Sequence, residues 1–242
     1  MEKKYRLTEE TKEWCGHTLH RIEALKDFGN VKAGDKGGWI EKEENLNQEG
    51  NAWVSGNAWV YGNAEVSGNA KVYGNAEVSG NAKVSGNAEV YGNAEVYGNA
   101  WVYGNAEVSG NAEVYGNAEV YGNAEVYGNA EVSGNAEVSG NAWVSGNAEV
   151  SGNAEVSGNA WVSGNAEVYG NADYIVFKNW WSSGRFFTWT RSNNMWKVGC
   201  FHGTGEELIK KAYADSEKSG REYERIVKYV DSILADEEKS KE

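Results

Sequence analysis

Apolar and polar positions follow one fixed period through the middle of the chain. Between Gly50 and Tyr169 the phrase Gly-Asn-Ala-x-Val-[Ser/Tyr] occurs twenty times without an insertion. Ala and Val are the apolar positions common to every copy. A strict short period predicts a solenoid, in which each unit buries its apolar face only by stacking on its neighbours.

Each residue type in the phrase suits such stacking. We expect Val to point inward and Ala to fill a narrow corner. Gly and Asn are placed at the turn, because both tolerate the positive φ that a sharp turn requires. Stacked Asn side chains are expected to form hydrogen-bonded ladders along the solenoid.

Read from Val, the phrase Val-[Ser/Tyr]-Gly-Asn-Ala-x resembles the hexapeptide repeat of left-handed parallel β-helix proteins. The resemblance covers residues 50–169, about half of the chain, and recurs in every copy. It implies triangular coils of three hexads each, hence about 6–7 coils for twenty hexads. At about 4.8 Å per coil the shaft would be roughly 32 Å long.

The segments on either side of the shaft are predicted to close its two ends. We therefore expect an all-β solenoid with an N-terminal β cap (1–49), a β-helix shaft (50–172) and a C-terminal α+β cap (173–242). In the C-terminal cap the pattern predicts a β-hairpin and then two helices. Capping-box signals at Thr204-x-x-Glu207 and Ser219-x-x-Glu222 mark the expected helix starts.

The two ends resemble hexapeptide-repeat proteins carried by phages and prophages of Gram-positive bacteria. The sequence segments that carry this resemblance are Arg21-Ile-Glu-Ala-Leu-Lys-Asp-Phe28 and Gly199-Cys-Phe-His-Gly-Thr-Gly-Glu-Glu207. This resemblance implies a phage-encoded protein and brings no activity with it.

Negative charge is concentrated on the shaft. The chain has a net charge of −13, and residues 50–169 hold 13 Glu and 2 Lys. An 18-residue coil sorts the x positions onto three faces, of which the second carries an unbroken acidic ladder: Glu77, Glu95, Glu113, Glu131, Glu149 and Glu167. The ladder is interpreted either as solubilising protection of a β surface or as an acidic binding surface.

Aromatic side chains supply the other candidate binding positions. Trp143 and Trp161 should stack on adjacent coils of the first face, next to the C-terminal cap, and such a pair suggests a contact site. Four further aromatic residues are predicted to cluster on one coil: Tyr91, Tyr97, Trp101 and Tyr103.

Basic residues in the C-terminal cap form a second candidate, the cap collar: Lys178, Arg185, Arg191 and Lys197. They are interspersed with aromatic residues, a combination that can bind single-stranded nucleic acid. The alternative is that the aromatics form the cap core while the cations balance the neighbouring shaft. Direct nucleic-acid binding is not expected, because the acidic shaft would repel a phosphate backbone.

Signals for catalysis are weak in the sequence. Acyltransferases of the β-helix family usually carry a catalytic His and a loop thrown out of a coil. Here His17, His20 and His202 all lie in the caps, and no hexad is interrupted. Cys15 and Cys200 lie in opposite caps, and their spacing to His is not that of common zinc sites. We therefore expect no enzyme, cofactor or metal site.

The leading hypothesis is a non-enzymatic scaffold that binds another protein, as a phage-encoded accessory or host-manipulation protein. One alternative is an acidic decoy that mimics nucleic acid and inhibits a defence or DNA-binding protein. Others are a passive rod and a divergent hexapeptide acyltransferase. The sequence does not name the partner, and assembly of copies through the C-terminal cap stays open. No apolar run reaches membrane-spanning length and no secretory signal is visible, so a cytoplasmic location is expected.

Overall fold

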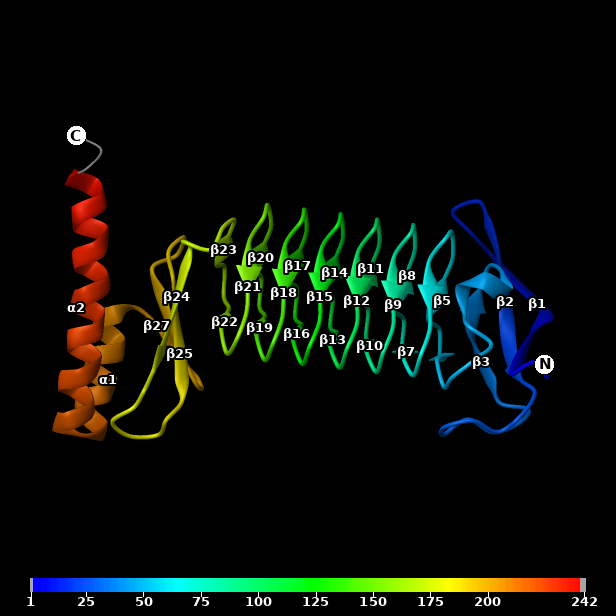
Figure 1. Ribbon diagram of the computed structural model, residues 1–242, viewed down its shortest axis with the longest axis horizontal. Helices are drawn as coiled ribbons and strands as arrows, with labels where there is room; N and C mark the ends of the chain where they lie inside the picture. Colours follow the sequence, from blue (N-terminus) through cyan, green and yellow to red (C-terminus); the bar gives the residue numbers. More distant parts are fainter. Residues whose placement is uncertain (1, 240–242) are drawn as a thin grey trace.

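A computed structural model describes residues 2–239 as an elongated molecule (Figure 1). A strand region forms the N-terminal end, a stack of parallel coils forms the shaft, and an antiparallel sheet with two helices forms the other end. The predicted fold class, a parallel β-solenoid with a cap at each end, is confirmed. No helix among residues 2–239 is long and apolar enough to cross a bilayer.

The shaft consists of two-residue strands that each contain one x-Val pair. The first face holds Trp53–Val54 (β4), Lys71–Val72 (β7), Glu89–Val90 (β10), Glu107–Val108 (β13), Glu125–Val126 (β16), Trp143–Val144 (β19) and Trp161–Val162 (β22). The second face holds Trp59–Val60 (β5), Glu77–Val78 (β8), Glu95–Val96 (β11), Glu113–Val114 (β14), Glu131–Val132 (β17), Glu149–Val150 (β20) and Glu167–Val168 (β23). The third face holds Glu65–Val66 (β6), Lys83–Val84 (β9), Trp101–Val102 (β12), Glu119–Val120 (β15), Glu137–Val138 (β18) and Glu155–Val156 (β21).

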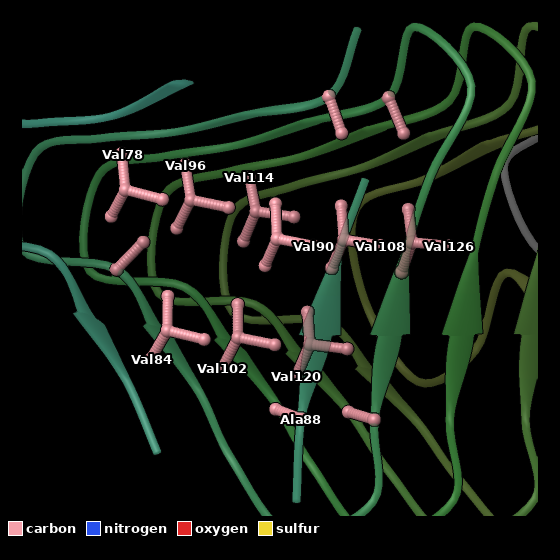
Figure 2. Packing of buried hydrophobic residues seen from close by; sticks show 14 of the residues in the cluster. Val78, Val84, Ala88, Val90, Val96, Val102, Val108, Val114, Val120 and Val126 are labelled. Carbon is pink, nitrogen blue, oxygen red and sulfur yellow. The ribbon is translucent and has the colours of Figure 1, made fainter. Parts of the chain in front are cut away.

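Identical residues lie above one another because the coil length equals three hexads. Val96 pairs in parallel register with Val78 on one side and Val114 on the other. Every shaft Val is fully buried, and the Ala residues of the hexads from Ala52 to Ala166 are at most 1% exposed. Figure 2 shows these columns of Val side chains filling the interior. Burying a Val side chain is worth roughly 1.5–3 kcal/mol before entropy is subtracted, so the core is the sum of many small, identical contributions.

The corners explain why Gly and Asn recur. Gly98 has φ +73°, and a Cβ at this position would lie 3.0 Å from the backbone N and O of Gly116. A larger residue would therefore be strained and would push adjacent coils apart. Beside it, the Asn99 side-chain amide donates to Asn117 Oδ1 at 3.0 Å, one rung of a ladder that repeats along the shaft. The predicted Asn ladders are confirmed.

The N-terminal cap extends the second face. Strands β1 (Tyr5–Trp14) and β2 (His17–Ala24) form an antiparallel hairpin, and β3 (Lys36–Ile40) joins β2 to β5. A short 3₁₀ helix, η1 (Glu43–Asn45), follows. The cap also supplies donors to carbonyls of the first coil: Lys4 is 1% exposed, and its ammonium donates to Ala52 O at 2.9 Å.

The C-terminal cap is an antiparallel sheet with one face toward the shaft and the other toward the helices. Its strands, in sheet order, are β24 (Tyr174–Lys178), β25 (Phe186–Thr190), β26 (Met195–Val198) and β27 (Phe201–Gly203). Tyr174 and Val176 pack against the shaft core, whereas Ile175 and Phe177 pack against the cluster shared with the helices. The sheet is therefore a middle layer between coils and helices.

Two helices complete this end of the molecule, α1 (Gly205–Asp215) and α2 (Glu217–Lys239). The predicted start of the first helix is confirmed, since Thr204 and Glu207 form a reciprocal capping box. The second prediction, a start at Ser219, is wrong. The helix begins at Glu217, where the Ser216 hydroxyl accepts from the Ser219 N–H at 3.1 Å.

Side chains of the C-terminal segment accept hydrogen bonds from backbone N–H groups at the open edge of the last coil. Each coil donates its backbone N–H groups to the next coil along the chain, so the last coil lacks acceptors. Thr188 Oγ1 accepts from the Trp161 N–H at 2.8 Å, and Ser192 Oγ accepts from the Glu167 N–H at 2.7 Å. These bonds end the solenoid without leaving a free β edge, which would otherwise be a site for pairing with other chains.

Candidate functional site

The glutamates of the acidic ladder lie directly above one another on the second face. The six glutamates pair in register from Glu77 to Glu167 along adjacent strands. Tyrosine hydroxyls donate hydrogen bonds to several of these carboxylates: Tyr97 donates to Glu113 at 2.9 Å and Tyr115 to Glu131 at 3.2 Å. Burial, followed by the charges of Glu77 and Glu113, raises the pKa of Glu95. Tyrosine donors thus stabilise several carboxylates of the ladder, whereas Glu95 experiences the repulsion of its neighbours.

The four aromatic residues expected to cluster do not form one patch. Tyr91 stacks on Tyr73 on the first face, with ring centroids 4.9 Å apart. Tyr97 stacks on a tyrosine of the second face, whereas Trp101 and Tyr103 contact each other on the third. Each coil turns through all three faces, so residues close in sequence diverge in space. The separation is a consequence of the triangular coil.

Trp143 and Trp161 do lie together, on β19 and β22 beside the cap. Their rings meet edge to face, with centroids 4.7 Å apart and an interplanar angle of 74°. Both side chains are half-buried. They form one wall of a groove of about 310 Å³, which we call the junction groove; further lining residues are Asn141, Asn159, Arg185 and Phe186. The groove lies at the junction, since its lining comes both from the last coils and from the cap.

The cap collar divides into two pairs of cations. Lys197 places its ammonium 4.0 Å from the Trp161 ring, and Arg185 lines the junction groove. By contrast, Lys178 lies over the Phe186 ring and Arg191 forms an ion pair with Glu237 of α2. Only Arg185 and Lys197 therefore approach the Trp pair. No ion pair of either is found among residues 2–239.

The cap aromatics mostly form a core, as one of the two interpretations held. Four of them are at most 7% exposed and pack with the helices: Trp181, Phe187, Trp189 and Trp196. Phe186 and Trp180 differ, being 39% and 71% exposed. The surface chemistry of the cap is therefore carried by few aromatic side chains.

His202 was placed in the cap by the sequence, but its contact with the shaft was not foreseen. It lies on β27 opposite Lys197 of β26, and both belong to the row that faces the last coil. Its ring packs on the corner residue Gly164, where a Cβ would lie 2.6 Å from His202 Cε1. The ring takes the place that a further coil would occupy. Although His202 is exposed as a residue, partial desolvation of its ring against the coil, together with the charge of Lys197, lowers the pKa of His202.

The neutral form of His202 is therefore favoured at neutral pH. No hydrogen bond or ion pair of this ring is found in the described part of the chain. An unprotonated imidazole with a free ring nitrogen is the chemical requirement for a general base. Alternating side-chain direction along β27 was the signal that could have placed it against the shaft.

The other two histidines have partners in the N-terminal cap. His17 Nδ1 lies 2.8 Å from Glu41 Oε1, and His20 Nδ1 lies 3.2 Å from Thr8 O. Cys15 and Cys200 are both exposed, free thiols.

No known protein-family profile matches the chain. Over 60 residues, however, it is 42% identical to a protein of Escherichia coli (strain K12) described as the uncharacterized acetyltransferase YdcK. The chain is a hexapeptide-repeat β-helix. The match covers 22% of this chain and 18% of the relative, so the chain corresponds to less than a fifth of that protein's length.

This similarity corrects the expectation that the protein is not an enzyme. That expectation was based on the uninterrupted hexads and on the absence of His from the shaft. Yet the relative that is 42% identical over 60 residues is named as an acetyltransferase. A groove lies beside the last coil at the junction with the cap, and His202 and Lys197 face the same coil. Nothing in the comparison bears on the expected phage origin, which stays a prediction.

Proposed function

We propose that the chain transfers acyl groups, and that transfer takes place where the last coil meets the C-terminal cap. The observation that carries the proposal is His202, whose pKa is lowered by burial and by Lys197 while its ring rests on Gly164. The name of the E. coli relative supports the reaction class.

The chemistry that this site would perform is a simple displacement on an acyl thioester. Neutral His202 takes a proton from an acceptor amine or hydroxyl as its nitrogen or oxygen attacks the thioester carbonyl. The new bond to the acyl carbon forms, the carbon–sulfur bond breaks, and the proton passes from His202 to the leaving thiolate. A general base of this kind contributes typically ~100-fold or more to the rate.

Thiol release from acetyl-coenzyme A, measured with a panel of amine and hydroxyl acceptors, tests this function. We expect turnover that falls ~100-fold or more in His202→Gln. His20→Gln is the matched control, because His20 lies in the opposite cap, where its ring contacts Thr8 O. The absence of turnover with every acceptor, or an unchanged rate in His202→Gln, would rule out the assignment.

A β-solenoid scaffold that binds another protein is the second candidate. It is favoured by the Trp143–Trp161 pair and by the exposed Phe186 that lines the same groove, since aromatic anchors dominate protein interfaces. A phage-encoded host-manipulation protein would use this surface, whereas an acidic decoy would use the glutamate ladder. Capture of a partner from host lysate distinguishes these two functions. Trp143→Ala should abolish partner binding through the aromatic surface. Glu113→Lys/Glu131→Lys should abolish partner binding through the glutamate ladder.

A further inference from the structure

The junction groove combines aromatic walls with unpaired positive charge. Trp143, Trp161 and Phe186 supply the aromatic surface, and Arg185 lies at the same hollow. The ammonium of Lys197 lies 4.0 Å from the centre of the Trp161 ring. Burial lowers the pKa of Lys197, so this cation is held in a partly desolvated place where an anion would stabilise it.

Charge changes sign from one side of the Trp pair to the other. Glu125 pairs with Trp143 on the side away from the cap. On the cap side, Arg185 lines the groove and the Lys197 ammonium lies over the Trp161 ring. An occupant with a neutral planar part and an anionic end would therefore be oriented, with its planar part at the Trp pair and its anion toward the cap. Arg185 and Lys197 have no carboxylate partner among residues 2–239, although the shaft carries many glutamates. We therefore infer that the anion that pairs with them comes from a bound ligand.

Trp161 connects the aromatic wall to the second cation. Its ring lines the groove and lies 4.0 Å from the Lys197 ammonium. Its indole N–H is buried without a hydrogen-bond partner within residues 2–239, as are those of Trp59 and Trp181. An unsatisfied buried donor is costly, so the Trp161 ring is held by its packing rather than by a hydrogen bond.

We propose that the junction groove binds a nucleoside phosphate, with the base against the Trp143–Trp161 wall and the phosphate toward Arg185 and Lys197. Bases stack on aromatic side chains whatever their sequence, and guanidinium groups bind phosphate in a bidentate manner. The volume of about 310 Å³ is at the lower end of ligand pockets, which suits one nucleotide. This binding does not depend on acyl transfer.

A nucleic-acid strand fits the same surface poorly. Beyond the groove it would run along a shaft that holds 13 Glu and 2 Lys in residues 50–169. Repulsion by that charge opposes each further phosphate, whereas a single nucleotide remains beside the cations. The nucleotide can be free or part of a larger carrier such as coenzyme A, and both share the chemistry that the groove recognises.

Tryptophan fluorescence and calorimetry with adenosine monophosphate test the proposal on the full chain. We expect saturable binding that weakens at high salt, because the Arg185 and Lys197 contacts are screened. Adenosine alone and inorganic phosphate alone should bind at least tenfold more weakly. Coenzyme A is a parallel probe: binding of adenosine monophosphate identifies a free nucleotide, and binding of coenzyme A alone identifies the carrier.

Variants localise the binding. Trp143→Leu and Arg185→Gln should each weaken it about tenfold or more. Trp101→Leu is the matched control, because this exposed Trp lies on the third face, and it should leave the affinity unchanged. A melting temperature for each variant separates a lost contact from a lost fold. Nucleotide binding is measured without an acyl donor or acceptor, so failure of acyl transfer and failure of nucleotide binding are distinguishable.

Three results would overturn the proposal. They are no binding of either adenosine monophosphate or coenzyme A at millimolar concentration, wild-type affinity in both Trp143→Leu and Arg185→Gln, and tighter binding of an oligonucleotide than of the mononucleotide. The last outcome would assign the groove to a nucleic-acid strand instead.

Discussion

The hydroxyl of Tyr97 donates to Glu113 Oε2 over 2.9 Å, from one coil to the next on the second face. The same tyrosine stacks on Tyr115 with ring centroids 5.0 Å apart. Burial first, and then the hydrogen bond and charge of Glu113, raise the pKa of Tyr97. One tyrosine side chain thus packs against the tyrosine of the next coil and also donates a hydrogen bond to a carboxylate of the acidic ladder. Such hydrogen bonds help to explain why the shaft tolerates so many glutamates.

Alkaline pH is expected to weaken the shaft. Unfolded tyrosine ionises near pH 10, whereas the pKa of Tyr61 in the fold is raised to about 12, by burial and by Glu77. Stability from such groups is fully present below pH 10 and is lost as pH rises through the folded value. The urea midpoint should therefore fall between pH 10 and 12. The variant Tyr73→Phe/Tyr97→Phe/Tyr103→Phe keeps the stacking and should show a shallower fall, and an identical fall would contradict the assignment.

Lys4 predicts the opposite pH dependence over a lower range. Burial, and then the charge of Lys26, lower its pKa from 10.5 to about 8. The penalty for burying the charged form is fully present below pH 8 and is relieved as pH rises toward 10.5, so it amounts to roughly 3 kcal/mol at ~1.4 kcal/mol per unit. The stability of wild type relative to Lys4→Met should therefore increase between pH 8 and pH 10 in urea unfolding.

Lys3→Met is the control, because this neighbouring lysine is exposed and pairs with Glu43 at the surface. A change with pH that both variants share would come from loss of a lysine in general and not from the buried site. A flat difference for Lys4→Met would mean that the buried ammonium is not destabilised by its surroundings.

The repeat made the shaft predictable from its residues. A period of six with Val and Ala in constant places determines that Val96 lies between Val78 and Val114, and a φ of +73° at Gly98 follows from the turn. Neighbouring copies then satisfy one another, so local pattern and tertiary structure agree.

The junction could not be predicted in the same way. Which cations reach Trp161 depends on the angle at which the cap sheet crosses the last coil, and that angle follows from packing between segments far apart in sequence. Arg185 and Arg191 look alike in the sequence, yet one lines the groove and the other pairs with Glu237. The position of His202 against the shaft likewise depends on its contact with Gly164, which lies far away in the sequence.

Two glycines of one corner column separate backbone strain from crowding. Gly140 and Gly158 both have φ +68°, but a Cβ at Gly140 would lie 3.0 Å from Gly158 N and O, whereas one at Gly158 would meet nothing within 4 Å. Gly158→Ala should cost only the left-handed backbone penalty of ~1–2 kcal/mol. Gly140→Ala should cost at least ~1 kcal/mol more, because the coils must separate. Urea unfolding measures both, and equal losses would mean that the coil spacing adapts freely.

Removal of the charge at position 197 should change the acid–base behaviour of His202. Lys197 contributes to the lowered pKa of that imidazole. In Lys197→Gln the pKa should move back toward its ordinary value near 6.5, so the acidic limb of the acyl-transfer rate should shift to higher pH. An NMR titration of the His202 ring tests the same point without activity. If the titration midpoint does not move, Lys197 is too well screened to influence the site.

The side-chain hydrogen bonds that end the solenoid are expected to hold the cap on the shaft. Thr188 is 1% exposed, and its hydroxyl accepts from the Trp161 N–H at 2.8 Å. Thr188→Val keeps the shape but leaves that N–H without an acceptor, at a cost of ~1–3 kcal/mol. Amide exchange at Trp161 should accelerate accordingly. The matched control is Thr190→Val, since the Thr190 hydroxyl donates to Asn193 within its own turn. If both variants leave the Trp161 amide equally protected, sheet packing rather than this bond closes the end of the shaft.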